Sequence, residues 1–374
     1  MERLAEMGDE VVVLTADYRM PGVEEMPSKA TVLRDLKGWW DWEEWAPAKL
    51  GPLERIHRER HNQRTLARVL EDFRPQVASV WDLGMGSWTI ATILEERGVP
   101  MVLTFLDDWV TFAHIFDAWT RVFDRRPWAR PLGRILGLET RLPRFDGALS
   151  SAASRMIAEA IHRNGRWKFP NAELIPIGVD TEDFPVSPSE RRNWSWRILY
   201  VGRVVPQKGV LTLVRALALL PPAARLEIVG HAHESQRVEV EQLAADLGVA
   251  DRIHFDVASS RQDLRRRYRS TDVLVFPSEW PEPFGLVPLE AMACGVPVVA
   301  TGTGGSGEFL ADGRNCLLFE PGDEQSLAAA LRSLAADPEL RGRIVAGGTE
   351  TASEMTMDRF AQRLAQLHHR AAGS

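Results

Sequence analysis

Short apolar runs alternate with longer amphipathic stretches along most of the chain. Strands are predicted at Val11–Thr15, Val77–Trp81, Met101–Phe105, Gly147–Ser150, Glu173–Pro176, Arg197–Val201, Arg225–Val229, Arg252–Phe255, Val273–Pro277 and Pro297–Ala300. Helices are predicted at Leu53–Phe73, Trp88–Arg97, Ser151–Asn164, Gly209–Leu219, Ser235–Leu247, Arg261–Ser270, Leu286–Cys294, Gln325–Ala335 and Asp358–Arg370. This alternation predicts an α/β protein whose parallel sheets are covered by helices on both faces.

The alternation of strands and helices is interrupted once, by a segment rich in proline, serine and charged residues. This composition predicts a linker between two lobes of similar size. We expect a first lobe over residues 1–185, a linker over 186–196, a second lobe over 197–354 and a final helix over 355–374. A doubly wound domain normally opens with a strand and a phosphate-binding turn, and this opening strand is not seen ahead of Val11. Ligand is expected at the carboxyl ends of the strands.

Composition excludes several classes of protein. The 374 residues carry a net charge of −7, which does not favour nucleic acid as a partner. The two cysteines, Cys294 and Cys316, cannot form a disulfide framework, and no apolar run is long enough to span a bilayer. We therefore expect a cytoplasmic protein.

Basic residues follow the first strand of the second lobe. That strand ends at Gly202, a short loop carries Arg203 and Lys208, and a helix starts near Gly209. Glycine lets a ligand approach the backbone, a helix N-terminus favours an anion, and the two cations could neutralise a diphosphate without a metal. The alternative is that both cations are ordinary solvated loop residues.

Two glutamates flank a second glycine-marked helix start. In EPFGLVPLE, Glu282 lies in a loop, Gly285 precedes a helix, and Glu290 falls about one turn inside it. Because helical side chains lean toward the N-terminus, Glu290 could reach the ribose of a nucleotide whose phosphate lies at the helix end. Glu282 would then face the sugar, unless both glutamates are simple surface charges.

Four motifs of the chain are VGRVVPQKG, LEIVGHA, EPFGLVPLE and GGSGEFLADGRNCLLFEPGD. Together they resemble the family 4 glycosyltransferases, of the group 1 type and the GT-B fold, which have two Rossmann-like lobes with parallel sheets facing a central cleft. The resemblance implies retaining transfer of a sugar from a UDP- or GDP-linked donor, with no metal or other cofactor. It implies that the donor is bound by Gly202, Arg203, Lys208, Gly230, His231, Glu282, Phe284, Gly285, Leu286 and Glu290, and that catalysis depends on Glu282, Arg203, Lys208 and Asp107.

The resemblance has departures. In TFLDDWVTF, Asp107 and Trp109 fit the family pattern, but Leu106 stands where relatives have a histidine near the donor sugar. Ile177 likewise replaces an asparagine in the family's I-P-N-G-V-D. Two other interpretations therefore stay open, namely a nucleotide-sugar 2-epimerase of the same fold and a nucleotide-sugar-binding protein of reduced activity. His114 could substitute for the missing histidine or be a structural residue.

Two first-lobe segments are rich in tryptophan. One contains Trp39, Trp40, Trp42 and Trp45, and the other, residues 118–144, contains Trp119 and Trp128 with seven arginines and only two acids. One interpretation is a surface for the acceptor, which would be a glycan, a lipid-linked sugar or a small molecule, with peripheral contact at the inner face of a membrane. The other is a packed helical insertion with solvated arginines.

Overall fold

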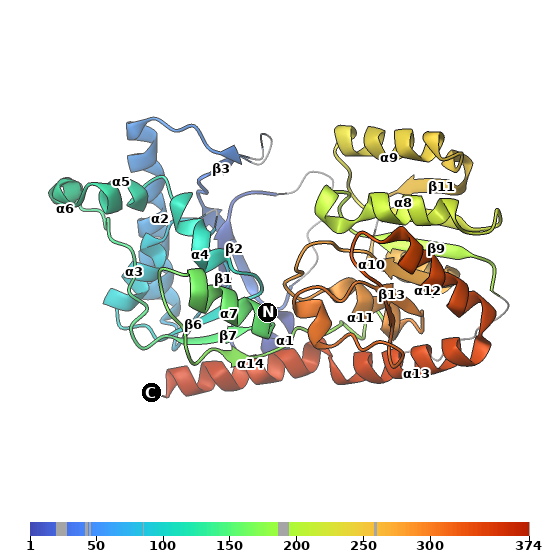
Figure 1. Ribbon diagram of the computed structural model, residues 1–374. Helices are drawn as coiled ribbons and strands as arrows, with labels where there is room; N and C mark the ends of the chain where they lie inside the picture. The colour runs from blue at the N-terminus through green and yellow to red at the C-terminus, as the bar shows by residue number, and fades with distance from the viewer. Residues whose placement is uncertain are drawn as a thin grey trace. The chain divides into compact units, whose positions relative to one another are not determined.

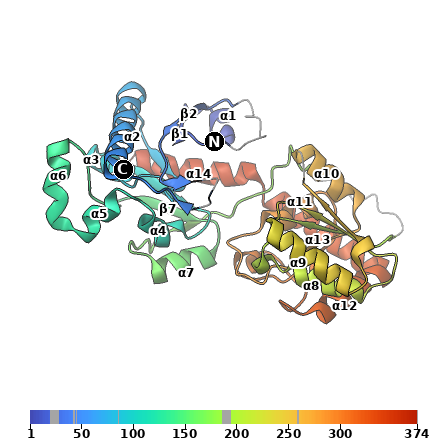
Figure 2. The same ribbon diagram turned by 90° about the horizontal axis from the view of Figure 1, so that it is seen from above.

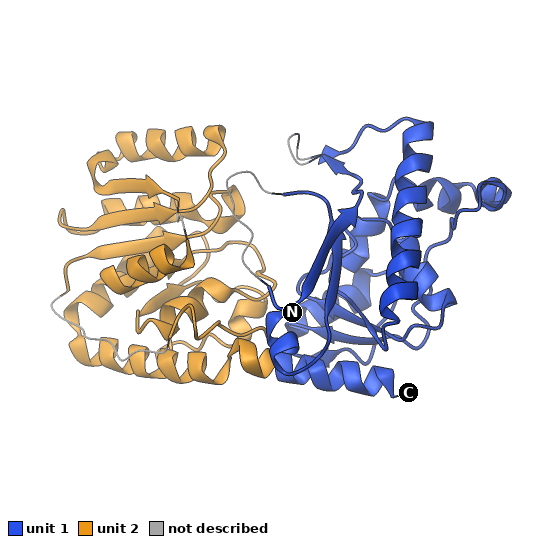
Figure 3. Ribbon diagram, turned by 180° about the vertical axis from the view of Figure 1, so that it is seen from behind, with its two compact units in different colours: residues 1–175, 361–374 blue, residues 176–360 orange. Residues whose placement is uncertain are grey.

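The computed structural model describes residues 1–19, 28–41, 44, 46–84, 86–185, 194–257 and 260–373. Contacts divide the chain into two compact units (Figure 3), unit 1 with Met1–Ile175 and Ala361–Ser374, and unit 2 with Pro176–Phe360. Residues 186–193 of the predicted linker lie outside the described residues.

Unit 2 contains a six-stranded sheet in which every pair of neighbouring strands is parallel. Its strands are β9 (Arg197–Val201), β10 (Arg225–Val229), β11 (Ile253–Asp256), β12 (Val273–Phe276), β13 (Val298–Ala300) and β14 (Leu317–Leu318). The spatial order β11-β10-β9-β12-β13-β14 reverses direction at β9 and β12. In an open sheet of this kind, ligands bind at the carboxyl ends of the strands where the order reverses.

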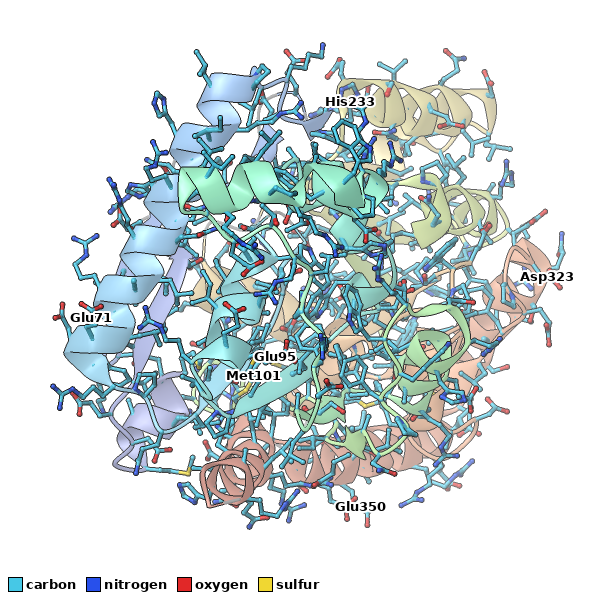
Figure 4. All side chains as sticks on the ribbon, turned by 90° about the vertical axis from the view of Figure 1, so that its left-hand side faces the viewer. Glu71, Glu95, Met101, His233, Asp323 and Glu350 are labelled. Atoms are coloured by element: carbon cyan, nitrogen blue, oxygen red, sulfur yellow. The ribbon has the colours of Figure 1, made fainter. Side chains whose placement is uncertain are left out.

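Helices cover both faces of this sheet (Figures 1 and 2). They are α8 (Val210–Ala218), α9 (Glu234–Asp246), α10 (Arg261–Ser270), α11 (Leu286–Ala293), α12 (Glu324–Ala336) and α13 (Pro338–Glu354), with 3₁₀ turns η3 (Pro206–Lys208), η4 (Ala250–Arg252) and η5 (Gly305–Glu308). Side-chain caps start several of them, as at Ser260 and at Asp323, which is labelled in Figure 4. Strands β9, β10 and β12 and helices α8 and α12 enclose a buried, mainly aliphatic core.

Unit 1 contains a parallel sheet of four strands, in the order β5 (Ala78–Val80), β6 (Met101–Phe105), β7 (Leu149–Ala152) and β8 (Glu173–Leu174). A separate parallel pair is formed by β1 (Val12–Ala16) and β2 (Thr31–Leu36), and a short antiparallel pair by β3 (Trp40–Asp41) and β4 (Ala46–Pro47). Strand β6 is buried along its whole length, as a central parallel strand requires.

The helices of unit 1 are α1 (Glu2–Glu6), α2 (Pro52–Phe73), α3 (Thr89–Glu96), α4 (Trp109–Phe112), α5 (Thr120–Arg125), α6 (Arg130–Leu136) and α7 (Arg155–Asn164), with 3₁₀ turns η1 (Ala113–Ile115) and η2 (Pro127–Ala129). The last helix, α14 (Met357–Ala372), belongs to unit 1 from Ala361 onward. It is fixed there by a 2.9 Å hydrogen bond between His368 and Ser79 of β5, and by ion pairs from Arg363 and Arg370 to Glu173.

The sequence pattern located most of these elements but missed some. Strand β2 was missed because three of its six residues are exposed and the other three are only half-buried, so no buried apolar run marks it. Strands β3, β4 and β14 have two residues each and are defined only by their partners. Helix α13 was missed because glycine and polar residues interrupt its apolar pattern. Trp42 and Trp45 lie outside the described residues.

Candidate functional site

The carboxyl ends of β9 and β10 approach each other at two glycines. Both have positive φ, 146° at Gly202 and 156° at Gly230, and a Cβ on Gly230 would lie 1.9 Å from the carbonyl oxygen of Gly202. No other residue fits here without moving the backbone. The following loops stay together because the Val204 N–H donates to the carbonyl of His231 at 2.9 Å.

Arg203 lies at this glycine contact and points to solvent. Its carbonyl accepts a 2.7 Å hydrogen bond from the hydroxyl of the buried Tyr200, which fixes the loop backbone. Burial, together with the negative charge of Glu282, raises the pKa of that tyrosine, so it stays a neutral donor. The guanidinium forms no ion pair with any residue in the described part of the chain. It is therefore available to an anion.

Lys208 and Glu282 form an ion pair. Turn η3 ends at Lys208, whose ammonium lies 2.5 Å from Oε1 of Glu282. The glutamate side chain is only 6% exposed and that of the lysine 25% exposed, so both charges are largely removed from water. Sequence reasoning placed both residues in the site but did not predict this contact, because they are separated by 73 intervening residues.

Glu282 is held by the backbone around it. Residue 282 forms a parallel bridge with Gly304, and its carbonyl accepts a 2.6 Å hydrogen bond from the Gly305 N–H. A Cβ on Gly304, which has φ of 64°, would lie 2.6 Å from the Glu282 backbone nitrogen. The glycine cluster after β13 thus allows two loops to touch and fixes the buried carboxylate.

Helix α11 begins directly after this loop. Gly285 precedes it with φ of 102°, and no side chain caps its first turn, so N–H groups at its start lack a side-chain acceptor. The neighbouring Phe284 is 4% exposed and packs on Phe309, with ring centroids 5.4 Å apart. Only the backbone of Phe284, and not its ring, is therefore available to a ligand.

Glu290 lies inside α11 and is oriented by a residue that sequence reasoning missed. The hydroxyl of the fully buried Tyr268, on α10, donates a 2.8 Å hydrogen bond to Oε2 of Glu290. Burial raises the pKa of Glu290, and the hydrogen bond from the tyrosine opposes that rise. The only sequence signal for Tyr268 is an aromatic residue at the end of a strongly charged helix.

A further contact ties the basic loop to the loop after β12. The Glu279 N–H donates to the carbonyl of Gln207 at 2.9 Å, and the Glu279 carboxylate accepts a 2.6 Å hydrogen bond from Thr212 of α8. Gly209, with φ of 67°, permits this approach because a Cβ there would lie 2.0 Å from the Pro277 carbonyl. Glu279 was also missed by the motif analysis.

Asp107 belongs to unit 1, where it follows β6. Its Oδ1 accepts a 2.9 Å hydrogen bond from the Trp109 N–H at the start of α4, and the residue is exposed. His114 packs edge-on against Trp88 and Trp167, with ring centroids 6.0 and 5.6 Å away. Burial lowers the pKa of His114, as expected of a neutral structural histidine.

Some tryptophans of the tryptophan-rich segments of unit 1 are buried in the hydrophobic core. Trp39 and Trp119 are 1% and 4% exposed and share a small hydrophobic cluster, in which the Trp119 indole donates to the Glu139 carbonyl. Trp128, in contrast, is 75% exposed. Within the described residues, no helix is both long and apolar enough to cross a membrane.

Comparison with solved structures defines the class of this protein. Over the whole chain it superposes on sucrose-phosphate synthase from Thermosynechococcus elongatus, covering 92% of that protein, with a TM-score of 0.70 at 22% identity. It also matches the Anabaena HepE protein in complex with UDP-glucose, covering 87% of this chain and 86% of that one, with a TM-score of 0.62 at 22% identity. The predicted fold class is therefore confirmed, and the chain is a GT-B protein.

Sequence comparison defines the family. Residues 186–351 match the family model described as glycosyl transferases group 1. A D-inositol 3-phosphate glycosyltransferase of Xylanimonas cellulosilytica is 32% identical over 75% of this chain and 70% of that protein. The chain belongs to the group 1 glycosyltransferases, enzymes that use a nucleotide sugar, as its motifs predicted.

Proposed function

We propose that this enzyme transfers a sugar, with retention of anomeric configuration and without a metal, from a UDP- or GDP-linked donor to a hydroxyl acceptor. The observation that carries the proposal is the convergence of the Lys208–Glu282 ion pair, the solvent-facing Arg203 and the uncapped start of α11 in unit 2. Two cations and a helix N-terminus favour a diphosphate, while the two glutamates favour sugar and ribose hydroxyls.

Each site residue then has a role. Arg203 and Lys208 neutralise the diphosphate, Glu290 accepts hydrogen bonds from the ribose, and Glu282 binds the donor sugar. The Gly202 backbone, the amides of Phe284, Gly285 and Leu286, and the loop at Gly230 and His231 complete the donor site, the last two beside the base. Asp107 of unit 1 remains the catalytic candidate from that unit.

The side chains suit a front-face displacement. The acceptor oxygen forms a bond to the anomeric carbon as the bond from that carbon to the phosphate oxygen breaks, and the acceptor proton moves to the leaving phosphate. Catalysis then depends on positioning and on stabilising the charge that develops on the diphosphate. Arg203, Lys208 and the α11 N-terminus supply that stabilisation.

The acceptor is proposed at the level of chemical class. A glycan, a lipid-linked sugar or a small polyol fits, and the name of the Xylanimonas relative points to a phosphorylated cyclitol. We also propose that the enzyme is cytoplasmic and contacts a membrane peripherally through residues 118–144, a segment that contains seven arginines and only two acidic residues.

The donor is tested first by thermal shift with UDP, GDP, ADP and TDP and their sugars. A ligand at about 100 times its Kd adds roughly 2.7 kcal/mol of stability. Turnover is then measured with the stabilising donor, in the presence and absence of EDTA, and the product anomer is determined by NMR. Stabilisation by none of the nucleotides would refute the proposal, and conversion of the donor without any acceptor would favour an epimerase instead.

Arg203→Ala tests the site itself. Because its guanidinium has no ion pair in the described chain, the variant should keep the stability of the parent while turnover falls by about 10²–10³. Arg163→Ala, an exposed arginine on α7, is the matched control and should leave turnover unchanged. Near-normal turnover of Arg203→Ala would contradict the assignment.

A further inference from the structure

Helix α6 and the turn η2 before it carry apolar residues on two different faces, one buried and one exposed. The inner face packs on unit 1 through Ala129, which is 6% exposed, and Gly133, where a Cβ would lie 2.1 Å from Cγ2 of Thr140. Figure 1 shows α5 and α6 projecting from the body of unit 1. The close contact at Gly133 fixes the rotation of the helix, so the residues on its other face must point away from the core.

The outer face consists of Trp128, Leu132 and Ile135, which we call the α6 ridge. Their exposed fractions are 75%, 54% and 80%. The spacings of four and three residues place them on one side of the helix. A helix of a globular protein normally presents polar residues on that side, and exposed apolar patches mark surfaces that bind a partner.

The charges beside the ridge have a single sign. Residues 125–138 contain Arg125, Arg126, Arg130 and Arg134 and no acidic residue. All four are exposed, and none forms an ion pair with another residue of the described chain. The carboxylates of the surrounding segment are engaged elsewhere, since Asp124 pairs with Arg166, and Glu139 with Arg141.

We propose that the α6 ridge docks on an anionic phospholipid bilayer, with its three apolar side chains in the interfacial region and the four arginines on lipid phosphates. Tryptophan favours the headgroup level, and arginine attracts anionic lipid while its stem stays in the apolar layer. A second copy of the chain is the weaker partner because a symmetric pairing of two ridges would bring the two arginine sets together.

This inference deepens the membrane contact proposed above and rests on it, but it does not depend on the transfer reaction. The proposed membrane-contact surface is also smaller than residues 118–144 as a whole, because Trp119 is buried in the hydrophobic core. The segment that follows α6 in the chain is held to the rest of unit 1 by hydrogen bonds at Arg144 and Asp146. Glu95 of α3, labelled in Figure 4, accepts hydrogen bonds from the N–H groups of Arg144 and Asp146.

The test is co-sedimentation of the full chain with vesicles of phosphatidylcholine alone, or containing about 30% phosphatidylglycerol. Binding is expected only to the anionic vesicles, and should weaken in about 0.5 M salt, where the Debye length is ~4 Å. Trp128→Ser/Ile135→Ser should reduce binding more than tenfold. Arg126→Gln/Arg130→Gln should reduce it by about fivefold per arginine at low salt.

The matched control is Val238→Ser/Leu247→Ser, which removes two exposed apolar side chains of unit 2 and should bind as the parent does. The readout is bound protein, so a failure of the proposed reaction would leave it unaffected. No preference for anionic vesicles, or unchanged binding of the Trp128→Ser/Ile135→Ser variant, would overturn the proposal. A dimer in lipid-free solution that this variant abolishes would assign the ridge to a second copy and overturn it equally.

Discussion

The Lys208–Glu282 ion pair makes a prediction about stability that separates the structural role of the lysine from its proposed catalytic role. Lys208→Ala would leave the Glu282 carboxylate, which is 6% exposed, without its cation. Removing one partner of a fully buried pair costs about 3–5 kcal/mol. Because the lysine side chain is 25% exposed, we expect a somewhat smaller loss of about 2–4 kcal/mol.

The cost arises from the stranded charge, so neutralising it should restore stability. Lys208→Ala/Glu282→Gln should recover at least half of the loss, although turnover stays reduced by about 10²–10³ because the diphosphate has lost a cation. The assays are the thermal unfolding midpoint, for which the single variant should fall by roughly 5–10 °C, and turnover with saturating donor.

Lys49→Ala, an exposed lysine of unit 1, is the control and should change neither quantity. The reasoning would be refuted if Lys208→Ala lost no more stability than Lys49→Ala. It would also be refuted if the double variant were less stable than Lys208→Ala, since the carboxylate would then not be the source of the cost.

Two more predictions concern buried polar contacts. Tyr268→Phe removes the hydroxyl that orients Glu290, so calorimetry should show weaker binding of the ribonucleoside diphosphate by about fivefold, but unchanged binding of its 2′,3′-dideoxy form. Equal losses for both nucleotides would contradict a ribose contact. Burial lowers the pKa of His368 to about 4, below its ordinary 6.5, so the unfolded chain takes up the proton first as pH falls. Unfolding free energy should therefore drop by up to about 3 kcal/mol between pH 6.5 and 4, and His368→Gln should flatten this dependence while His369→Gln, on an exposed side chain, should not. An unchanged pH profile for His368→Gln would show that its burial is not the cause.

Much of the fold could be predicted because its signals are local. Strands such as β6 and β12 are buried on both faces and therefore read as continuous apolar runs. Helix ends carry their own marks, as at Ser260, which caps α10, and Gly285, which precedes α11. Strand β2 escaped prediction because its residues are exposed or only half-buried, and it is defined by its pairing with β1.

The residues of the candidate site also fall into two groups, those that local sequence signals identify and those that only tertiary contacts identify. Arg203, Lys208 and Glu290 could be nominated because each stands at a fixed distance from a glycine or a helix start. Glu279 and Tyr268 could not, since their roles come from contacts with distant segments. For residues 118–144, the sequence interpretation as a surface included too many residues. A count of arginines and tryptophans cannot distinguish the buried Trp119 from the exposed Trp128.

The sequence by itself determined the alternation of strands and helices and the glycine-marked loops that nominate a candidate ligand edge, because each depends on near neighbours in the chain. Tertiary structure alone decided that Lys208 lies 2.5 Å from Glu282, that Tyr268 orients Glu290, and that Trp128, in the turn η2 before α6, is an exposed tryptophan. These facts depend on which distant segments the sheet brings side by side. A close approach such as that at Gly304 is permitted by the residue type, but its partner is chosen only by the fold.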